Sequence, residues 1–166
     1  MAISLQKANI EDCAEIHALQ IKAFASLLEK YRDTATNPGA EPLERIVQRM
    51  EQPHTDYYFI RLDGENIGAI RIVRFDDTAC RIAPVFLLPT YQNKGYAQQA
   101  ICLAEALYPA AARWELDTIK QESKLCYLYE KLGYRQTGKE EELQPGMTIV
   151  FTRSECEGKR IAGTPG

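Results

Sequence analysis

The segment Gln92-Asn93-Lys94-Gly95-Tyr96-Ala97 has the composition of a turn that can bind an anion. It follows an apolar run ending at Leu88-Pro89 and opens a stretch of helical periodicity that reaches Leu107. The first N–H groups of a helix have no intrahelical partner and lie at the positive end of its dipole, so a phosphate is favoured there. Gly95 lets the backbone approach such a group closely or adopt a positive φ. Because the segment has one glycine, the nucleotide motifs G-x-G-x-x-G and G-x-x-x-x-G-K-[ST] are excluded.

Two acidic residues and one thiol are further candidates for chemistry. Glu115 and Asp117 lie two positions apart, so a strand would turn both carboxylates to one face. They are either candidate bases that deprotonate an ammonium through water or members of a solvated strand face. Cys126 could act as the nucleophile of a covalent mechanism. No histidine stands at a recognisable spacing to activate its thiol, so the alternative interpretation, a small buried residue of a helix, is favoured. His17 and His54 are interpreted as structural or surface residues.

Alternating and helical apolar patterns, together with turn residues, predict the elements that would position these groups. The expected strands are Ile3–Lys7, Tyr57–Leu62, Ile67–Phe75, Cys80–Leu88, Arg113–Ile119, Tyr134–Gly138 and Met147–Thr152. The expected helices run from about Asn9 to Tyr31, from Leu43 to Met50, from Gly95 to Tyr108, and through Leu125–Leu132 to a stop at Gly133. The connection Asp33–Pro42 is either a substrate lid or a surface link between helices.

Size and composition limit the class of protein. The 166 residues predict a single domain over residues 1–152, with a flexible tail over 153–166. A net charge of −3 argues against nucleic-acid binding and mildly suits a cationic substrate such as an amine. The five cysteines form no C-x-x-C pair, so neither a metal site nor a disulfide framework is expected. Without a secretory leader or a long apolar stretch, we expect a cytoplasmic protein that does not bind membranes.

Two motifs in a fixed order now carry a resemblance to a known family. Gln92-Asn93-Lys94-Gly95-Tyr96-Ala97 opens one helix, and Tyr129-Glu130-Lys131-Leu132-Gly133-Tyr134 closes the next. This order resembles the GNAT superfamily of N-acetyltransferases, and the resemblance spans about Ile3 to Thr152. It implies an α/β (α+β) fold whose mixed, mostly antiparallel central sheet has six to seven strands, with helices on both faces.

The resemblance also implies a site for acetyl-CoA. The diphosphate would lie on Gln92, Asn93, Lys94, Gly95, Tyr96 and Ala97, and the pantetheine arm would pair with the strand at Phe86, Leu87 and Leu88. Backbone N–H groups near Phe86 or Leu87 would stabilise an oxyanion, and Pro84 would mark a break in the ladder. Gln92 would orient the loop and Lys94 would contact a phosphate. For both residues the alternative is a solvated side chain in a polar turn.

The resemblance assigns Tyr129 as the general acid for the departing thiolate, and a core tyrosine is the alternative. Two features depart from the family pattern. The strand Cys80–Leu88 carries no acidic base, and Glu122-Ser123-Lys124 stands where many members have an asparagine.

We therefore expect an N-acetyltransferase that moves acetyl directly to a primary amine, in a small molecule or a peptide, within a ternary complex. The expected oligomeric state is either a monomer or a homodimer. The alternatives are a catalytically silent acyl-CoA-binding sensor or interaction module, and a scaffold without a CoA site.

Overall fold

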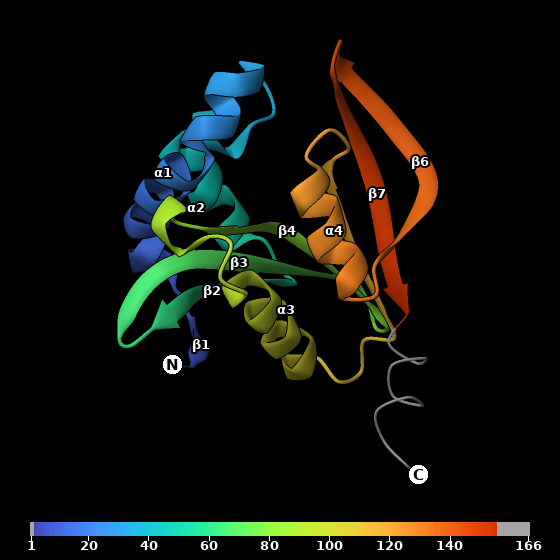
Figure 1. Ribbon diagram of the computed structural model, residues 1–166. Helices are drawn as coiled ribbons and strands as arrows, with labels where there is room; N and C mark the ends of the chain where they lie inside the picture. The colour runs from blue at the N-terminus through green and yellow to red at the C-terminus, as the bar shows by residue number, and fades with distance from the viewer. Residues whose placement is uncertain (1, 156–166) are drawn as a thin grey trace. The chain divides into compact units, whose positions relative to one another are not determined.

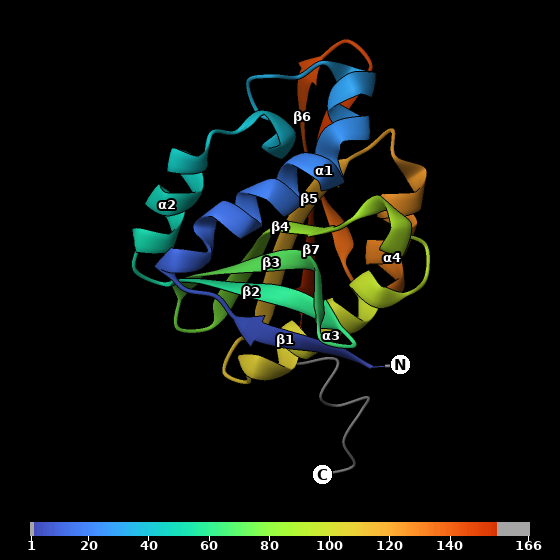
Figure 2. The same ribbon diagram turned by 90° about the vertical axis from the view of Figure 1, so that its left-hand side faces the viewer.

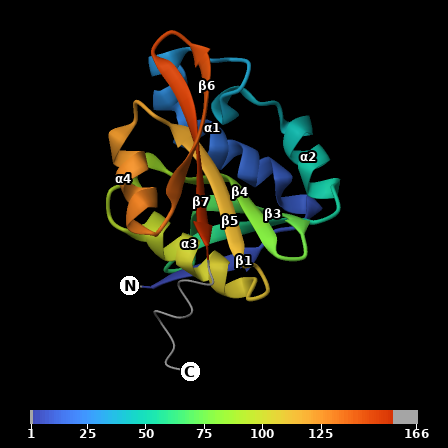
Figure 3. The same cartoon turned by 90° about the vertical axis from the view of Figure 1, so that its right-hand side faces the viewer.

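The computed structural model describes residues 2–155; Figure 1 labels the helices and most strands, and β5 is labelled in Figures 2 and 3. The strands are β1 (Ile3–Lys7), β2 (Thr55–Leu62), β3 (Glu65–Asp76), β4 (Ala79–Leu87), β5 (Arg113–Ile119), β6 (Arg135–Gln144) and β7 (Met147–Glu155). The α-helices are α1 (Cys13–Tyr31), α2 (Leu43–Glu51), α3 (Tyr96–Leu107) and α4 (Ser123–Lys131). Short 3₁₀ turns are η1 (Ile10–Asp12), η2 (Pro38–Ala40) and η3 (Pro89–Tyr91).

The strands form one sheet of seven strands in the order β1-β2-β3-β4-β5-β7-β6. The pairs β1–β2, β2–β3, β5–β7 and β6–β7 are antiparallel, whereas β4 pairs with β5 in parallel. This mixed, mostly antiparallel sheet confirms the expected fold class. The turn between β2 and β3 is made by Asp63 (φ 51°) and Gly64 (φ 83°), the paired positive angles that a two-residue hairpin turn requires.

The chain divides into two compact units. The first contains the chain up to Val73 together with Pro84–Leu107, and the second contains Arg74–Ala83 together with the chain from Tyr108 onward. Strand β4 therefore begins in the second unit and ends in the first.

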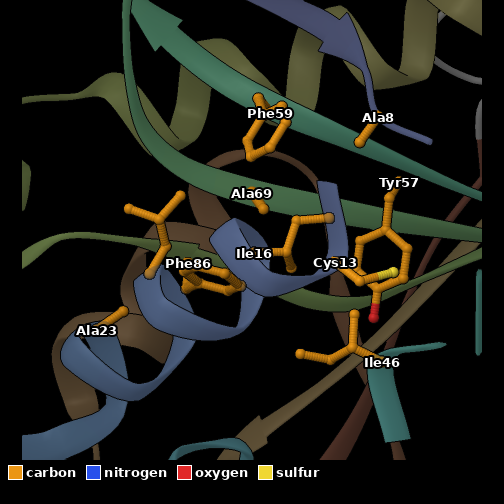
Figure 4. Packing of buried hydrophobic residues seen from close by; sticks show 10 residues of the cluster. Ala8, Cys13, Ile16, Ala23, Ile46, Tyr57, Phe59, Ala69 and Phe86 are labelled. Atoms are coloured by element: carbon orange, nitrogen blue, oxygen red, sulfur yellow. The ribbon is translucent and has the colours of Figure 1, made fainter. Parts of the chain in front are cut away.

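The first unit is built on β1, β2 and β3. Its helices α1 and α2 lie on one side of β2 and β3, and α3 lies on the other side (Figures 1 and 2). On the α1 side, a cluster of buried residues joins the two helices to the strands (Figure 4). The members labelled there are Ala8, Cys13, Ile16, Ala23, Ile46, Tyr57, Phe59, Ala69 and Phe86. Because Phe86 belongs to this cluster, the end of β4 is fixed by the same core that holds α1.

The connection from Asp33 to Pro42 is anchored to both helices of this unit. The fully buried Gln20 donates from Nε2 to Pro38 O and to Glu41 Oε1, both at 2.8 Å. Arg49 of α2 forms two hydrogen bonds to the Glu41 carboxylate, at 2.8 and 2.5 Å. These bonds favour a fixed link between helices over a lid.

The second unit places β7 between β5 and β6 (Figure 3). Its core contains Trp114, Leu116, Tyr134 and Val150, of which Trp114, Tyr134 and Val150 have no exposed surface. Along β5, Trp114, Leu116 and Thr118 are buried, while Glu115 and Asp117 are intermediate in exposure. The strand period therefore separates the carboxylates from the core face.

Strand β6 begins in the predicted segment Tyr134–Gly138 and continues beyond it to Gln144. Gly138 (φ 94°) lies at a shift of register, where the pairs pass from Gln136↔Thr152 to Glu140↔Val150. A glycine that interrupts a strand pattern therefore marks a bulge here and not a terminus. Strand β7 likewise runs to Glu155, and the remainder of the tail expected over 153–166 lies outside the described residues.

Candidate functional site

The turn that precedes α3 has the backbone geometry of an anion-binding site. Asn93 (φ 63°) and Gly95 (φ 83°) both adopt left-handed angles. Gln99 N donates to Gly95 O at 3.2 Å as α3 begins, so the N–H groups just before Gln99 have no intrahelical partner. A Cβ added to Gly95 would meet no heavy atom within 4 Å. The backbone angle therefore requires glycine here, and the space beside it is open to a ligand.

The other residues predicted for this cradle differ in exposure. Gln92, Asn93 and Lys94 are exposed, Tyr96, Ala97 and Leu88 are intermediate, and Phe86 and Leu87 are buried. Gln92 Nε2 donates to Leu87 O at 2.9 Å. This bond ties the turn to the end of β4, so it favours a role in the loop over a solvated side chain for Gln92.

Gly68 of β3 is a positioning residue that the sequence patterns did not identify. A Cβ built on Gly68 would lie 2.1 Å from Phe86 O and 2.9 Å from Leu87 Cα, closer than atoms can approach. Leu88 N also donates to Ile67 O at 2.8 Å. The close approach of β3 therefore sets the position of the backbone at Phe86 and Leu87. An isolated glycine inside a strand pattern was the available signal.

The pairing of β4 with β5 covers only the start of β4. Its register joins Ala79–Arg81 to Arg113–Glu115, whereas β4 continues to Leu87. Pro84 lies beyond the last pair. Because the register stops early, the later part of β4 can offer backbone groups to an extended ligand, as an exposed strand edge does.

Tyr129 lies in the second unit and is only 7% exposed. Its ring packs edge-on against Tyr134, with centroids 6.5 Å apart. Burial, with smaller contributions from Asp117 and Cys126, raises the pKa of Tyr129 to about 12. The hydroxyl therefore stays protonated at neutral pH and can donate a hydrogen bond. Burial also raises the pKa of Cys126, whose Sγ lies 3.6 Å from Ile119 O, so this residue is a thiol and a poor nucleophile.

The two candidate bases have different surroundings. Asp117 Oδ2 accepts from Arg81 Nη2 at 2.5 Å, and Glu115 Oε2 lies 3.0 Å from Arg113 Nε. Burial nevertheless raises the pKa of Asp117, against the lowering effect of Arg81 and with a further rise caused by Glu141. A raised pKa makes a carboxylate a better proton acceptor, so Asp117 is the stronger candidate. Glu141 was missed because it lies beyond the segment Tyr134–Gly138 that the sequence patterns identified as the start of a strand.

Within residues 2–155, no group of three or more His, Cys, Asp or Glu side chains has an arrangement that could hold a metal ion. The same part of the chain contains no helix with the length and apolar character needed to cross a membrane.

Comparison with known proteins gives a family match. The model of the Acetyltransferase (GNAT) family matches residues 22–134, more than half of the chain. A lipid-A-disaccharide synthase of Actinobacillus pleuropneumoniae serotype 3 (strain JL03) is 27% identical over 134 residues, covering 81% of this chain and 32% of that protein. The chain thus spans about a third of the length of this curated relative.

Solved structures of low sequence identity share the fold. A chimera of spermidine N-acetyltransferase SpeG from Vibrio cholerae and hSSAT has a TM-score of 0.75 at 16% identity, covering 95% of this chain and 98% of its own. The AAC(6')-Ib structure with ribostamycin and coenzyme A has a TM-score of 0.77 at 14% identity and full coverage of both chains. PaiA N-acetyltransferase from Thermoplasma acidophilum, in complex with coenzyme A, has a TM-score of 0.65 at 18% identity, covering 93% of this chain and 99% of its own.

Gly68→Ala should destabilise the fold by about 1–3 kcal/mol, because the new methyl group must displace Phe86 and Leu87. Urea unfolding measures the change, and amide NMR shifts at Phe86–Leu88 locate it. Gly64→Ala is the matched control, since its Cβ meets only Arg61 Nη2 at 4.0 Å and its cost comes from the positive φ of the turn. Unchanged shifts at Phe86–Leu88 in Gly68→Ala would contradict the close approach of β3 to β4.

Tyr129 should make the stability of the protein depend on alkaline pH. Its pKa in the folded chain is about 12 against an ordinary value of 10.0, so its contribution is complete below pH 10 and is lost as the pH rises toward 12. Between about pH 9 and pH 11, wild type should lose about 1 kcal/mol more unfolding free energy than Tyr129→Phe. Urea unfolding at both pH values tests this. The 65% exposed Tyr127 provides the control, because Tyr127→Phe should lose as much as wild type.

Proposed function

Because this chain belongs to the GNAT acetyltransferase family, we propose that it transfers the acetyl group of acetyl-CoA directly to a primary amine within a ternary complex. The observation that carries the proposal is the open turn at Gly95, which presents helix N–H groups one short 3₁₀ turn after a strand whose edge is incompletely paired. Several structures of the same fold are described as complexes with coenzyme A or acetyl-CoA, which supports this donor.

The proposal assigns donor binding to the end of β4 and the following turn. The N–H groups at the start of α3 bind the diphosphate, and the backbone of Phe86–Leu88 pairs with the amides of the pantetheine arm. When bound, acetyl-CoA supplies a thioester carbonyl that an amine can attack. A backbone N–H near Phe86 or Leu87 stabilises the oxyanion that develops on this carbonyl.

Tyr129 is proposed to act on the departing sulfur mainly as a hydrogen-bond donor. With a pKa of about 12, it holds its proton more strongly than a thiol with an ordinary value near 8.5. Complete proton transfer would thus be uphill by roughly 5 kcal/mol at the start of the reaction. A hydrogen bond to a developing thiolate requires no such transfer, and it strengthens as the negative charge grows.

Asp117 is proposed as the base that takes the proton of the acceptor ammonium, directly or through water. Its carboxylate also contributes to the raised pKa of Tyr129. An ammonium group bound beside Asp117 would offset that negative charge and lower the pKa of Tyr129. Binding of the acceptor would then improve Tyr129 as a proton donor.

The names of structural neighbours support an amine as the acceptor. Two are described as spermidine or spermidine/spermine N-acetyltransferases, and two as aminoglycoside acetyltransferases of the AAC(6')-Ib type. At 14–16% identity these likenesses support the class of the reaction, and the choice of acceptor depends on this chain's own residues.

A panel of primary amines with acetyl-CoA, followed by release of thiol, tests the proposal. We expect acceptor-dependent thiol release, and Tyr129→Phe should lower kcat by about 10²–10³-fold while acetyl-CoA binding changes little. Tyr127→Phe, on the same helix and exposed, should retain wild-type kcat. Tight binding of acetyl-CoA without release for any amine would favour a silent sensor, and an unchanged rate in Tyr129→Phe would remove Tyr129 from the mechanism.

Gly95→Val should weaken acetyl-CoA binding at least tenfold by calorimetry, because the side chain would occupy the open space beside the turn and strain its positive φ. Gly146→Val is the matched control for strain. Gly146 has φ 84°, and an added Cβ there also meets nothing within 4 Å, but it lies in the β6–β7 turn. Gly146→Val should lower the free energy of unfolding and leave the affinity for acetyl-CoA unchanged. Full affinity in folded Gly95→Val would show that the diphosphate binds elsewhere.

A further inference from the structure

A pocket of about 290 Å³ lies on the sheet of the second unit and is lined by three cationic side chains and one carboxylate. The cations are Arg81, Lys139 and Arg153, and the carboxylate is Glu115. Its volume is close to the lower limit of ordinary ligand pockets, so it suits a small group and not a large ligand.

Strand register explains why cations from separate strands meet there. Arg81 of β4 is opposite Glu115 of β5, and Glu115 is opposite Arg153 of β7, so these three residues form one row across the sheet. Arg153 is also paired with Glu155 at 3.1 Å, but both side chains are about half exposed. Such exposed pairs are weak, and the Arg153 guanidinium can turn to a ligand at small cost.

The bulge at Gly138 brings the third cation to the pocket. Between the pairs Gln136↔Thr152 and Glu140↔Val150, the residues Thr137, Gly138 and Lys139 all stand against the single residue Phe151. Lys139 Nζ lies 4.6 Å from the centre of the Phe151 ring, and Thr137 Oγ1 donates to Phe151 O at 3.2 Å. A regular ladder would oppose one residue to Phe151, so the bulge is what adds Lys139 to this surface.

An acidic region adjoins the cationic row on the same face. Asp117 is opposite Phe151, and Glu141 is opposite Ile149, so both carboxylates share the face of Glu115 and Arg153. Along β5, Asp117 stands two residues from Glu115, a step of roughly 7 Å. Asp117 Oδ2 is paired with Arg81 Nη2 at 2.5 Å, so the acidic and cationic groups meet on this face, and Asp117 shares its carboxylate with one cation of the row.

From this arrangement we infer that the acceptor is an amino acid, whose carboxylate binds Lys139 and Arg153 in the pocket while its ammonium lies at Asp117. This inference rests on the proposed function. Arginine suits the recognition of a carboxylate because its planar guanidinium can donate two parallel hydrogen bonds. A polyamine lacks a group for the cationic row, and its second ammonium would be repelled there. The pocket therefore selects for an anionic group on the acceptor.

Matched acceptors test the inference. Each amino acid in a panel, including 4-aminobutyrate, is compared with its carboxamide and with the amine formed by removing the carboxylate, here propylamine. We expect kcat/KM to be at least tenfold higher for the acids. Acetylation of propylamine or polyamines as efficiently as the acids would overturn the inference and leave the proposed acetyl transfer intact.

The double variant Lys139→Gln/Arg153→Gln separates the pocket from the catalytic groups. Both side chains are exposed, so folding should be retained. KM for the acids should rise at least tenfold with kcat nearly unchanged, while kcat/KM for propylamine should stay within twofold of wild type. Lys22→Gln, an exposed lysine of α1, is the control for loss of charge and should behave as wild type. An equal loss of kcat/KM for the acids and for propylamine would contradict the assignment of Lys139 and Arg153 to the carboxylate site.

A binding experiment decides the inference even if no amine is acetylated. Titration of 4-aminobutyrate and its carboxamide, followed by NMR at the amides of Thr137–Lys139 and Phe151–Arg153, should show saturable shifts with the acid alone. These shifts should disappear in the double variant. Equal shifts with both compounds, or none with either, would overturn the carboxylate site, whereas failure of acetyl transfer would show only in the thiol-release assay.

Discussion

The close approach of β3 to β4 at Gly68 is the contact on which the end of β4 and the turn at Gly95 depend. Phe86 O lies where a Cβ on residue 68 would be, so no other residue allows this spacing without a shift of the backbone. The end of β4 is then held by Leu88 N to Ile67 O and by Phe86 in the core, and Gln92 ties the turn to it. The N-terminus of α3 therefore begins at a defined place, as a site built on rigid elements requires.

Within the second unit, Asp117 and Tyr129 are electrostatically coupled. Asp117 is held by Arg81 and influenced by Glu141, and burial still raises its pKa. Tyr129 is buried within the electrostatic influence of Asp117, and its pKa rises for the same main reason, loss of water. A carboxylate with a raised pKa that also raises the pKa of a phenol is typical of functional sites, since the environment sets which group accepts and which donates a proton.

The bulge at Gly138 gives β6 a role beyond closing the sheet. It places Lys139 over Phe151 while the strand beyond it carries Glu141 on the face of Asp117. This surface thus carries charges of both signs, with Arg81 and Asp117 paired within it, which suits a ligand with two charged ends.

From sequence alone, the order of strands and helices, the turn at Gly95 and the family motifs could be predicted, because each depends on local periodicity or on the positive φ that glycine allows. The length of β6 beyond Gly138 was not predicted, since a glycine has the same local signal whether it ends a strand or makes a bulge. Three features depended on tertiary structure. They are the close contact of Gly68 with β4, the raised pKa that makes Asp117 a stronger candidate base than Glu115, and the shared pocket of Arg81, Lys139 and Arg153. Each arises from register or burial between segments distant in sequence, which no local pattern records.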